Sequence, residues 1–349
     1  MINKFQNISI DSIATYLPKG KISLKDLAED FGEDSVANII KVTGIENIRI
    51  SEPSETSSDM CMRAAEELIM KTEVDKNEIG AIVFVSQTPD YVLPATSNVI
   101  QNKLDLPNET LCFDINAGCS GYIYGILQAC ILIETRSSKK VLVLAGDTST
   151  KLIHPMDRSL KLVFGDAGSA TLISRGDKDL YISMQTDGKG FDKLIVPHGG
   201  FRNPITPESY ATTVDKDGNC RSSINLFMDG MSILEFAMNR VPKNIFSILE
   251  YSNKSIKDVD LFALHQANRF IINAIRKKMN IEDKLMPSNT RDFGNTGSAS
   301  IPLLLSDILG IKKTGNLSSV VLSGFGVGLS WGSALCDISN TLIFEPINR

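Results

Sequence analysis

The sequence predicts an α/β protein built from two similar halves. Short apolar segments of strand length alternate with segments of helical length, and this pattern occurs twice at one fixed offset. Residues 79–87 and 258–266 are 179 positions apart, and so are residues 141–147 and 320–326. Strands that alternate with helices form mixed or parallel sheets covered on both faces. We therefore expect two α/β units packed about a pseudo-twofold axis.

The linking segments fit the same scheme. Residues 58–72 have helical length and an apolar stripe. The glycine-rich turns around Cys119 and Ser298, each followed by an apolar helix, are again 179 residues apart. Chance similarity between βα units remains an alternative. We expect an N-terminal half at 1–180, a cap region at 181–225 that is rich in Gly, Pro, Asn and Ser and has no counterpart, and a C-terminal half at 226–349.

Composition narrows the functional class. Of 349 residues 42% are hydrophobic and 22% charged, as in globular proteins, and the net charge of −5 argues against a general nucleic-acid binder. The six cysteines form no CxxC pair and there are three histidines, so we expect no metal site and no cofactor. Neither a signal peptide nor a membrane-spanning helix is predicted. We expect a cytoplasmic protein with free thiols and no membrane partner.

Cys119 is the candidate nucleophile. Small residues surround it at 117–121, after a strand that ends near Ile115, and the helix that follows is apolar on nearly all sides. A thiol at a helix N-terminus faces the positive end of the helix dipole, which predicts a lowered pKa and a nucleophilic thiolate. A buried core cysteine is the alternative, and it is our interpretation of Cys112, Cys130 and Cys336.

Two further residues lie where chemistry is expected. His265 directly follows an apolar strand, and functional groups of α/β folds gather beyond the carboxyl ends of strands. Asn295 lies in a Gly-Asn-Thr-Gly turn. Either could be structural, the asparagine as a simple turn former. The glycine-rich segments 164–168 and 324–328 fit no phosphate loop and indicate backbone that passes close to a substrate or to the opposing half.

Together these segments resemble the β-ketoacyl-acyl-carrier-protein synthase III family of the thiolase superfamily. The matching segments, whose order and spacing are specific, are 43–45 (TGI), 94–96 (PAT), 114–121 (DINAGCSG), 157–158 (DR), 164–168 (FGDAG), 265–268 (HQAN), 294–302 (GNTGSASIP) and 324–332 (GFGVGLSWG). The resemblance spans nearly the whole chain. It implies a duplicated thiolase-like five-layer α/β/α/β/α fold, with pseudo-twofold halves, that works as a homodimer.

The resemblance also implies a function. It implies an acyltransferase of the 3-oxoacyl-[acyl-carrier-protein] synthase III type, in fatty acid biosynthesis and lipid metabolism. It assigns the catalytic roles to Cys119, His265 and Asn295. Cys119 would take an acyl group from an acyl-CoA or acyl-carrier-protein thioester, with the Cys119 and Val327 N–H groups as oxyanion hole. His265 and Asn295 would then stabilise the enolate of malonyl-acyl-carrier protein as carbon dioxide leaves, beside the apolar Phe325.

Substrate binding is less regular. Arg158 matches an arginine that binds the donor in the family, whereas Arg269 is displaced by one position from another such arginine. Asn38 stands at the family's adenine-stacking tryptophan and Val42 at a further arginine. Leu93 occupies the position of a partner-supplied phenylalanine that closes the acyl pocket, which predicts a longer or branched acyl group. The basic residues of the helix after His265 form the predicted carrier-protein dock, with a plain solvated face as the alternative: Arg276, Lys277 and Lys278.

Two other functions stay open. One is transfer of the acyl group to an oxygen or nitrogen acceptor without condensation. The presence of both His265 and Asn295 favours condensation, because simple transfer needs no enolate stabiliser. The other is a non-catalytic thiolase-fold subunit, against which the intact Cys119 argues.

Overall fold

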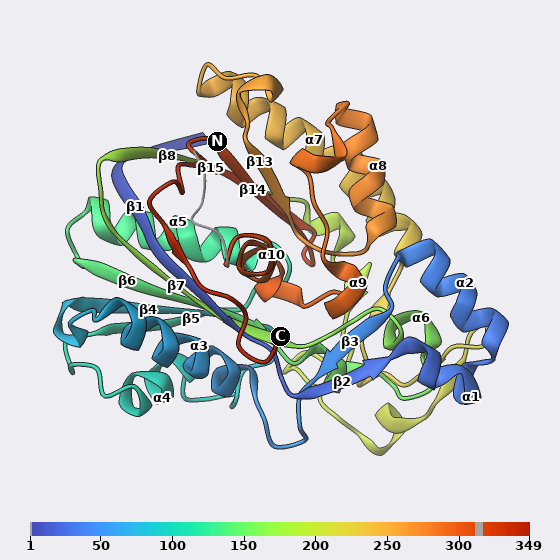
Figure 1. Cartoon of the computed structure of the whole chain (residues 1–349). Helices are drawn as coiled ribbons and strands as arrows, with labels where there is room; N and C mark the ends of the chain where they lie inside the picture. The colour runs from blue at the N-terminus through green and yellow to red at the C-terminus, as the bar shows by residue number, and fades with distance from the viewer. Residues whose placement is uncertain (1, 311–316) are drawn as a thin grey trace.

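The computed structural model describes residues 2–310 and 317–349 (Figure 1). Ten strands form one mixed sheet in the described chain, in the order β13-β14-β15-β8-β1-β7-β6-β4-β5, with β16 paired to β1. Its strands are β1 (Ile2–Tyr16), β4 (Ile79–Val85), β5 (Leu111–Ile115), β6 (Lys140–Asp147), β7 (Ala167–Arg175), β8 (Lys178–Thr186), β13 (Leu261–Leu264), β14 (Val320–Gly326), β15 (Ser330–Cys336) and β16 (Leu342–Ile343). The α/β class predicted from the sequence is confirmed.

Some helices cover the outer faces of this sheet, and two lie between its N-terminal and C-terminal strands. The helices are α1 (Ala28–Phe31), α2 (Glu33–Thr43), α3 (Ser57–Thr72), α4 (Thr96–Lys103), α5 (Gly121–Glu134), α6 (Arg158–Lys161), α7 (Gly230–Tyr251), α8 (Arg269–Met279), α9 (Thr290–Phe293) and α10 (Ser300–Leu309). None of the helices in the described ranges is both long and apolar enough to span a bilayer.

The packing gives five layers. Helices α5 and α10 lie in the middle, and Ile126 of α5 and Leu304 of α10 share one buried cluster with strand residues from both halves of the sheet. Helix α3 covers the outer face of the N-terminal strands through a second cluster, and α7 and α8 cover the C-terminal strands through a third. Figure 1 shows α10 at the centre with α3 and α7 on opposite outer sides. The expected α/β/α/β/α order is confirmed.

The strands show why they are buried on both faces. In β4, Ala81, Val83 and Val85 face the central helices while Ile82 and Phe84 face α3. Side chains of a strand alternate between faces, so a strand covered on both sides must be apolar throughout.

The duplication is visible in the elements. Strand β4 matches β13, β6 matches β14, and the central helices begin at Gly121 and Ser300, 179 residues apart. The counterpart of β5 is the short helix α9. The halves join where β8 pairs with both β1 and β15, and β8 crosses the position expected as the boundary between 180 and 181.

Element ends differ from the sequence expectation for a local reason. The helix expected at 58–72 is α3, which begins under a capping box of Thr56 and Asp59. The strand expected at 79–87 ends at Val85, because the backbone N–H of Gln87 donates to the Asp147 carboxylate, 2.8 Å away, instead of to a neighbouring strand.

The segment between β8 and α7 contains short elements: β9 (Leu194–Ile195), β10 (Thr213–Val214), β11 (Cys220–Arg221) and β12 (Phe227–Met228). It is tied to the body by the ion pair of Arg221 with the fully buried Asp157. Strands β9 and β12 pair with each other, which places Leu194 and Met228 beside the cavity described below. Two further small sheets join β10 to β11, and β2 (Gly20–Ser23) to β3 (Asn47–Ile50).

Candidate active site

Cys119 lies between the end of β5 and the start of α5, in a turn that glycines make possible. Opposite it, at the end of β14, stands Gly326, where an added Cβ would lie 2.7 Å from the Cys119 Cβ and 2.9 Å from its Sγ. Gly324 faces the Cys119 carbonyl in the same way, at 2.7 Å. The prediction that segment 324–328 passes close to the opposing half is therefore confirmed.

The expected lowering of the Cys119 pKa was wrong. The thiol is 6% exposed, and burial, with the nearby Asp147 carboxylate, raises its pKa to about 12. The backbone N–H groups of Cys119 and Val327 oppose this rise by hydrogen bonding to the sulfur. The helix α5 begins only at Gly121, so the dipole of its N-terminus acts on a thiol that has lost most of its water. In the free protein the thiol is neutral at pH 7.

Three separate segments meet at one cavity of about 80 Å³. Cys119 reaches it from the turn before α5, His265 from the end of β13 and Asn295 from the turn after α9. The remaining walls are apolar for the most part: Val163, Phe164, Leu194, Met228, Gly230, Ile233, Ala267, Asn268, Ile271, Phe325 and Gly326. The structure thus brings together the cysteine, the histidine and the asparagine that the sequence singled out.

His265 is almost fully buried, at 1% exposure. Its ring stands edge-on to Phe325, with 5.4 Å between centroids, and its Nδ1 lies 2.7 Å from the Ser300 Oγ. Burial lowers the pKa of the imidazole to about 3, partly offset by a hydrogen bond to the Gly297 backbone. His265 is therefore neutral at pH 7. When the Ser300 hydroxyl donates to Nδ1, the ring proton resides on Nε2.

Asn295 is fixed by its own turn. Its Oδ1 accepts from the Gly297 N–H at 3.0 Å, so the side chain is oriented and its NH₂ group keeps its donors. Its backbone donates to the Val163 carbonyl and accepts from the Gly165 N–H, at 2.8 and 2.9 Å. Asn295 is thus both a turn residue and an amide donor held at the cavity.

Sequence reasoning missed Asp147, which ends β6. Its carboxylate is fully buried and accepts from the Gln87 N–H at 2.8 Å, and from the Ser298 N–H and hydroxyl at 2.9 and 2.7 Å. Burial raises its pKa to about 6, against these hydrogen bonds. The carboxylate thus links Gln87, in the turn after β4, to Ser298, in the turn after Asn295. An aspartate that ends an otherwise apolar strand was the signal available in the sequence.

Other predicted residues do not line this cavity. Leu93 is 79% exposed on the surface of the chain. Arg158 donates to the Ser35 hydroxyl at 2.9 Å and to the Asp217 carbonyl at 3.0 Å. Arg269 is exposed and packs over Gly44, where an added Cβ would lie 2.5 Å from its Nε.

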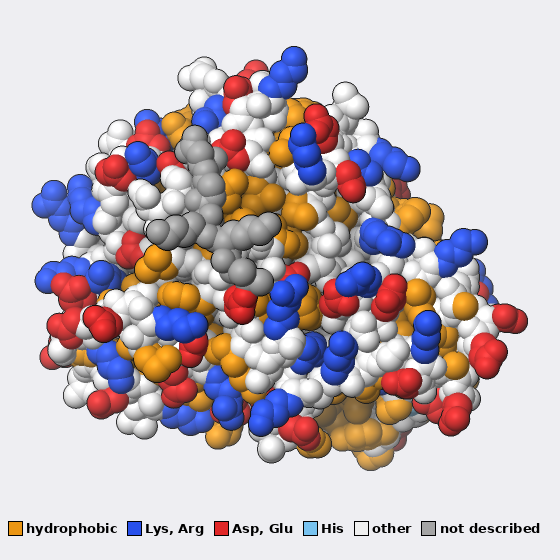
Figure 2. Space-filling model, viewed as in Figure 1, with side chains coloured by type: hydrophobic (Ala, Val, Ile, Leu, Met, Phe, Trp, Pro, Cys, Tyr) orange, Lys and Arg blue, Asp and Glu red, His pale blue; other side chains and the backbone are white. Residues whose placement is uncertain are grey.

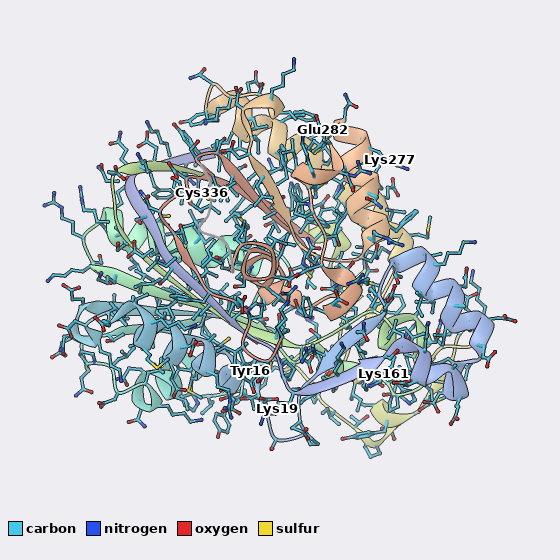
Figure 3. The ribbon with its side chains drawn as sticks, in the orientation of Figure 1. Tyr16, Lys19, Lys161, Lys277, Glu282 and Cys336 are labelled. Carbon is cyan, nitrogen blue, oxygen red and sulfur yellow. The ribbon has the colours of Figure 1, made fainter. Side chains whose placement is uncertain are left out.

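The predicted docking helix is α8. Arg276 is half-buried and bound to Asp283, with 3.2 Å between Nε and Oδ1, so its charge is partly neutralised. Lys277 and Lys278 are exposed, and Lys278 donates to Asn239. Figure 3 shows Lys277 at the outer surface of this helix layer. On the face in Figure 2, basic and acidic side chains are interspersed.

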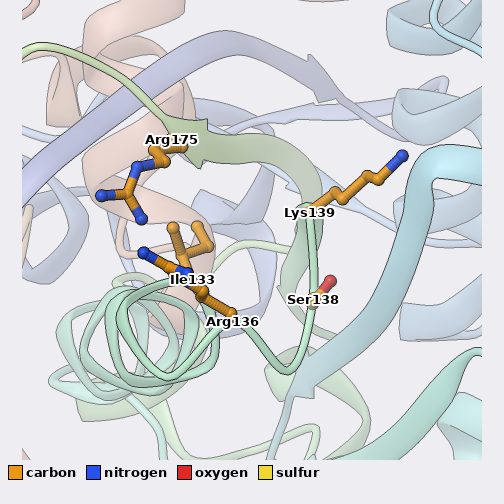
Figure 4. Close-up of a pocket in the computed structure, with 5 residues that line it drawn as sticks. All are labelled: Ile133, Arg136, Ser138, Lys139 and Arg175. Atoms are coloured by element: carbon orange, nitrogen blue, oxygen red, sulfur yellow. The ribbon is translucent and has the colours of Figure 1, made fainter.

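A separate, more open cavity of about 450 Å³ lies at the far end of α5. Arg136, Lys139 and Arg175 line it, and Figure 4 shows the two arginines together while the lysine points away. Basic side chains commonly gather near the negative end of a helix dipole. This cavity contains none of the predicted site residues.

The fold and the cavity define a class, the acyltransferases with a thiolase-like fold and a buried cysteine. Comparison with known proteins gives the family: the chain belongs to the β-ketoacyl-[acyl-carrier-protein] synthase III family. Family models for 3-oxoacyl-[acyl-carrier-protein (ACP)] synthase III and for its C-terminal part match residues 113–190 and 249–338.

Individual relatives agree over nearly their whole length. The chain is 36% identical to a β-ketoacyl-[acyl-carrier-protein] synthase III of Campylobacter fetus over 332 residues, covering 94% of this chain and 97% of the relative. It is 33% identical to a putative 3-oxoacyl-[acyl-carrier-protein] synthase 3 of Campylobacter jejuni, with 97% and 96% covered. A solved 3-oxoacyl-(acyl-carrier protein) synthase from Burkholderia xenovorans superposes with a TM-score of 0.93, at 36% identity and 99% and 98% coverage.

Proposed function

We propose that the protein joins an acyl thioester to malonyl-acyl-carrier protein by decarboxylative Claisen condensation, through an acyl group held on Cys119. The observation that supports this best is the convergence of Cys119, His265 and Asn295 on one small apolar cavity. A nucleophile alone would suffice for acyl transfer, whereas the two additional donors serve an enolate.

The first half-reaction moves the acyl group onto the cysteine. The Cys119 sulfur attacks the thioester carbonyl and loses its proton, the new C–S bond forms, and the donor thiol leaves with a proton. The N–H groups of Cys119 and Val327, which act to lower the pKa of the thiol, are the donors that we propose for the oxyanion. Because the resting thiol is neutral, its proton must leave as the attack occurs, and the departing donor thiol takes up a proton in the same half-reaction.

The second half-reaction forms the carbon–carbon bond. His265 and Asn295 donate hydrogen bonds to the malonyl thioester carbonyl, the bond to the carboxylate breaks, and carbon dioxide leaves. The electron pair stays on the enolate, which attacks the acyl carbonyl, and the Cys119 sulfur departs and regains a proton. Phe325 beside His265 keeps this side of the cavity apolar, which disfavours the carboxylate and favours its loss.

Basic residues at the surface support a proposal for the acyl donor and for its docking patch. We propose acyl-CoA or acyl-carrier protein as donor and Lys277 and Lys278 of α8 as the part of the docking patch with unshared charge. Arg158 and Arg269 are the candidate donor-binding arginines, although Arg158 must leave Ser35 or Asp217 to bind a ligand.

We also propose a homodimer. In the described chain β5 pairs on one side only, with β4, so its other edge is open, and Leu111 on it is 45% exposed. Its Asp114 carboxylate accepts from the Thr96 and Ser97 N–H groups. These begin the helix that follows the exposed Val92 and Leu93. An open edge beside exposed apolar side chains suits pairing with a second copy, in which Leu93 could reach the partner's acyl cavity.

The decisive experiment acylates the pure protein and then adds malonyl-acyl-carrier protein. Labelled acyl thioesters should modify the peptide that contains Cys119, and the second step should release carbon dioxide and a 3-oxoacyl product. Label on another peptide contradicts the role of Cys119. Acylation without carbon dioxide release, but with transfer to an alcohol or amine, would instead establish simple acyl transfer. No acylation at all would indicate a non-catalytic subunit.

A further inference from the structure

A second cavity near the nucleophile, of about 290 Å³, is lined by residues that lie close in sequence to those of the cavity of Cys119, His265 and Asn295. The same two segments build both cavities. Cys119 and Phe325 line the first, while Ala117 and Val327 line the second. On the first segment the second cavity therefore begins two residues before the nucleophile, at Ala117, and on the other it begins at the predicted oxyanion-hole residue Val327, next to Gly326.

Polar side chains form one part of the wall of this second cavity, beside the apolar Ile115, Ala117 and Val327. Gln87 and Asn116 contribute amides, and Tyr124 and Thr186 contribute hydroxyls. Gln87 lies directly over the peptide that precedes the nucleophile, since a Cβ added to Gly118 would fall 2.0 Å from its Oε1. Glycine at 118 is thus what allows an amide to lie next to Cys119.

These polar groups have unused hydrogen-bonding capacity. Within the described residues the side-chain amides of Gln87 and Asn116 make no hydrogen bond, and the Tyr124 and Thr186 hydroxyls are 3.3 Å apart. A purely hydrocarbon acyl chain in this cavity would displace water from the amides and give nothing in return. An acyl group with its own donor or acceptor would replace that water.

The other half of the chain provides an internal comparison. Gln266 and Asn295 are the counterparts of Gln87 and Asn116 at the 179-residue offset. The Gln266 amide is buried and satisfied, because it donates to the Leu264 carbonyl at 2.7 Å and accepts from the Asn289 N–H at 3.2 Å. The same residue type at the same place in the fold is structural in one half and free in the other.

On the basis of the proposed condensation, we infer that the acyl group on Cys119 carries a hydrogen-bonding substituent such as a hydroxyl, and that Gln87 selects it. The substituent lies in the second cavity, against the Gln87 and Asn116 amides, while the malonyl unit takes the cavity of His265 and Asn295. Gln87 is a specificity-determining residue, distinct from the groups that break and form bonds.

The test compares two thioesters of equal length, butyryl and 3-hydroxybutyryl N-acetylcysteamine. Acylation of Cys119 is followed over time by intact-protein mass spectrometry, with peptide mapping of the product. The full-length wild-type protein should react about tenfold faster with the hydroxylated donor, the effect of one to two hydrogen bonds. Gln87→Leu, which keeps the side-chain volume but removes the amide, should bring the two rates together. Gln6→Leu, at an exposed position on β1, is the matched control and should keep the wild-type ratio.

Each outcome decides the inference. Equal wild-type rates, or an undiminished preference in Gln87→Leu, overturns it, and Tyr124→Phe provides a second variant that removes one hydroxyl if Gln87→Leu does not fold. If butyryl acylates Cys119 and malonyl-acyl-carrier protein is then decarboxylated without any advantage of the hydroxyl, this inference alone fails. If neither donor labels Cys119, the proposed function fails, and this inference with it.

Discussion

The two halves of the molecule present the same turn in opposite states. Cys119 and Ser298 are counterparts at the 179-residue offset, and each faces the end of a strand from the other half. Cys119 faces Gly326, where the lack of a side chain leaves the sulfur open to the cavity. Ser298 faces Asp147, whose carboxylate binds both its N–H and its hydroxyl. One turn is open to a ligand and the other is sealed.

Asp147 and Gly326 are themselves counterparts at that offset. The residue at the strand end therefore decides the state of the turn that it faces. The turn that Asp147 binds at Ser298 also holds Asn295, three residues before it, in place. One half of the chain therefore presents the nucleophile, and the other fixes the hydrogen-bond donor Asn295. The variants that follow break this comparison, from the largest expected effect to the smallest.

Replacing the open turn's thiol should have the largest effect. Cys119→Ala should lower condensation about 10⁴-fold or more, because no acyl group can be held. Ser298→Ala in the sealed turn should keep Cys119 acylation and lose about 1 kcal/mol of stability, through one missing hydrogen bond to Asp147. Acyl-enzyme formation by mass spectrometry and urea unfolding measure the two effects. Equal loss of acylation in both variants would remove the distinction between the turns.

His265→Ala should separate the two half-reactions. Decarboxylation of malonyl-acyl-carrier protein should fall about 10³-fold, since an enolate donor is lost, while Cys119 acylation should be retained within about tenfold. Release of labelled carbon dioxide and acylation by mass spectrometry are measured on the same sample. If both fall equally, His265 acts as the activator of the thiol in place of the enolate donor.

Asp147→Asn should change stability in a pH-dependent way. The pKa of Asp147 is about 6 in the folded chain, above the ordinary 3.8, so folding favours the protonated carboxyl. That contribution is complete below pH 4 and is lost as the pH rises through 6. The neutral variant should therefore gain about 3 kcal/mol relative to wild type between pH 4 and 6.

Urea unfolding across this pH range measures that gain. Asp177→Asn, at the exposed turn between β7 and β8, is the matched control and should follow the wild type throughout. A constant difference between Asp147→Asn and wild type would show that the carboxyl keeps one charge state over the whole range.

Ser300 should matter less, as a positioning residue. Ser300→Ala removes the hydroxyl 2.7 Å from the His265 Nδ1 and should lower decarboxylation about tenfold with little change in the melting temperature. Ser300→Thr should restore most of it. If threonine does not rescue activity, packing at the start of α10 is the cause and the hydrogen bond is not.

The smallest effect is expected at the surface. Lys277→Glu should raise KM for carrier-borne substrates about two- to fivefold and leave kcat unchanged, because exposed charge pairs are weak. High salt should abolish the difference. Lys19→Glu, far along the sequence from α8, is the comparison, and an equal rise in KM there would point to net charge as the cause.

The sequence predicted what depends on pattern. The duplicated α/β halves follow from apolar strands at a constant offset, and Cys119, His265 and Asn295 could be identified because each lies beside a strand end or a glycine turn. The raised pKa of the Cys119 thiol could not be predicted. It depends on how completely the folded chain buries the thiol, and on a carboxylate 28 residues along the chain whose proximity only the folded sheet reveals. The sequence also did not show that Leu93 and Arg158 lie outside the active-site cavity of a single chain, because this depends on the folded arrangement.

Gly326 has a consequence for how such a fold could diversify. After an internal duplication the two turns are equivalent, and one substitution at the facing strand end is enough to block a turn or to open it to a ligand. A side chain at 326 would collide with Cys119, because even its Cβ would lie 2.7 Å from the Cys119 Cβ, and loss of the carboxylate at 147 would remove the acceptor of the Ser298 N–H. In this fold the residue at each strand end, Gly326 or Asp147, thus decides whether the turn that it faces can take part in catalysis.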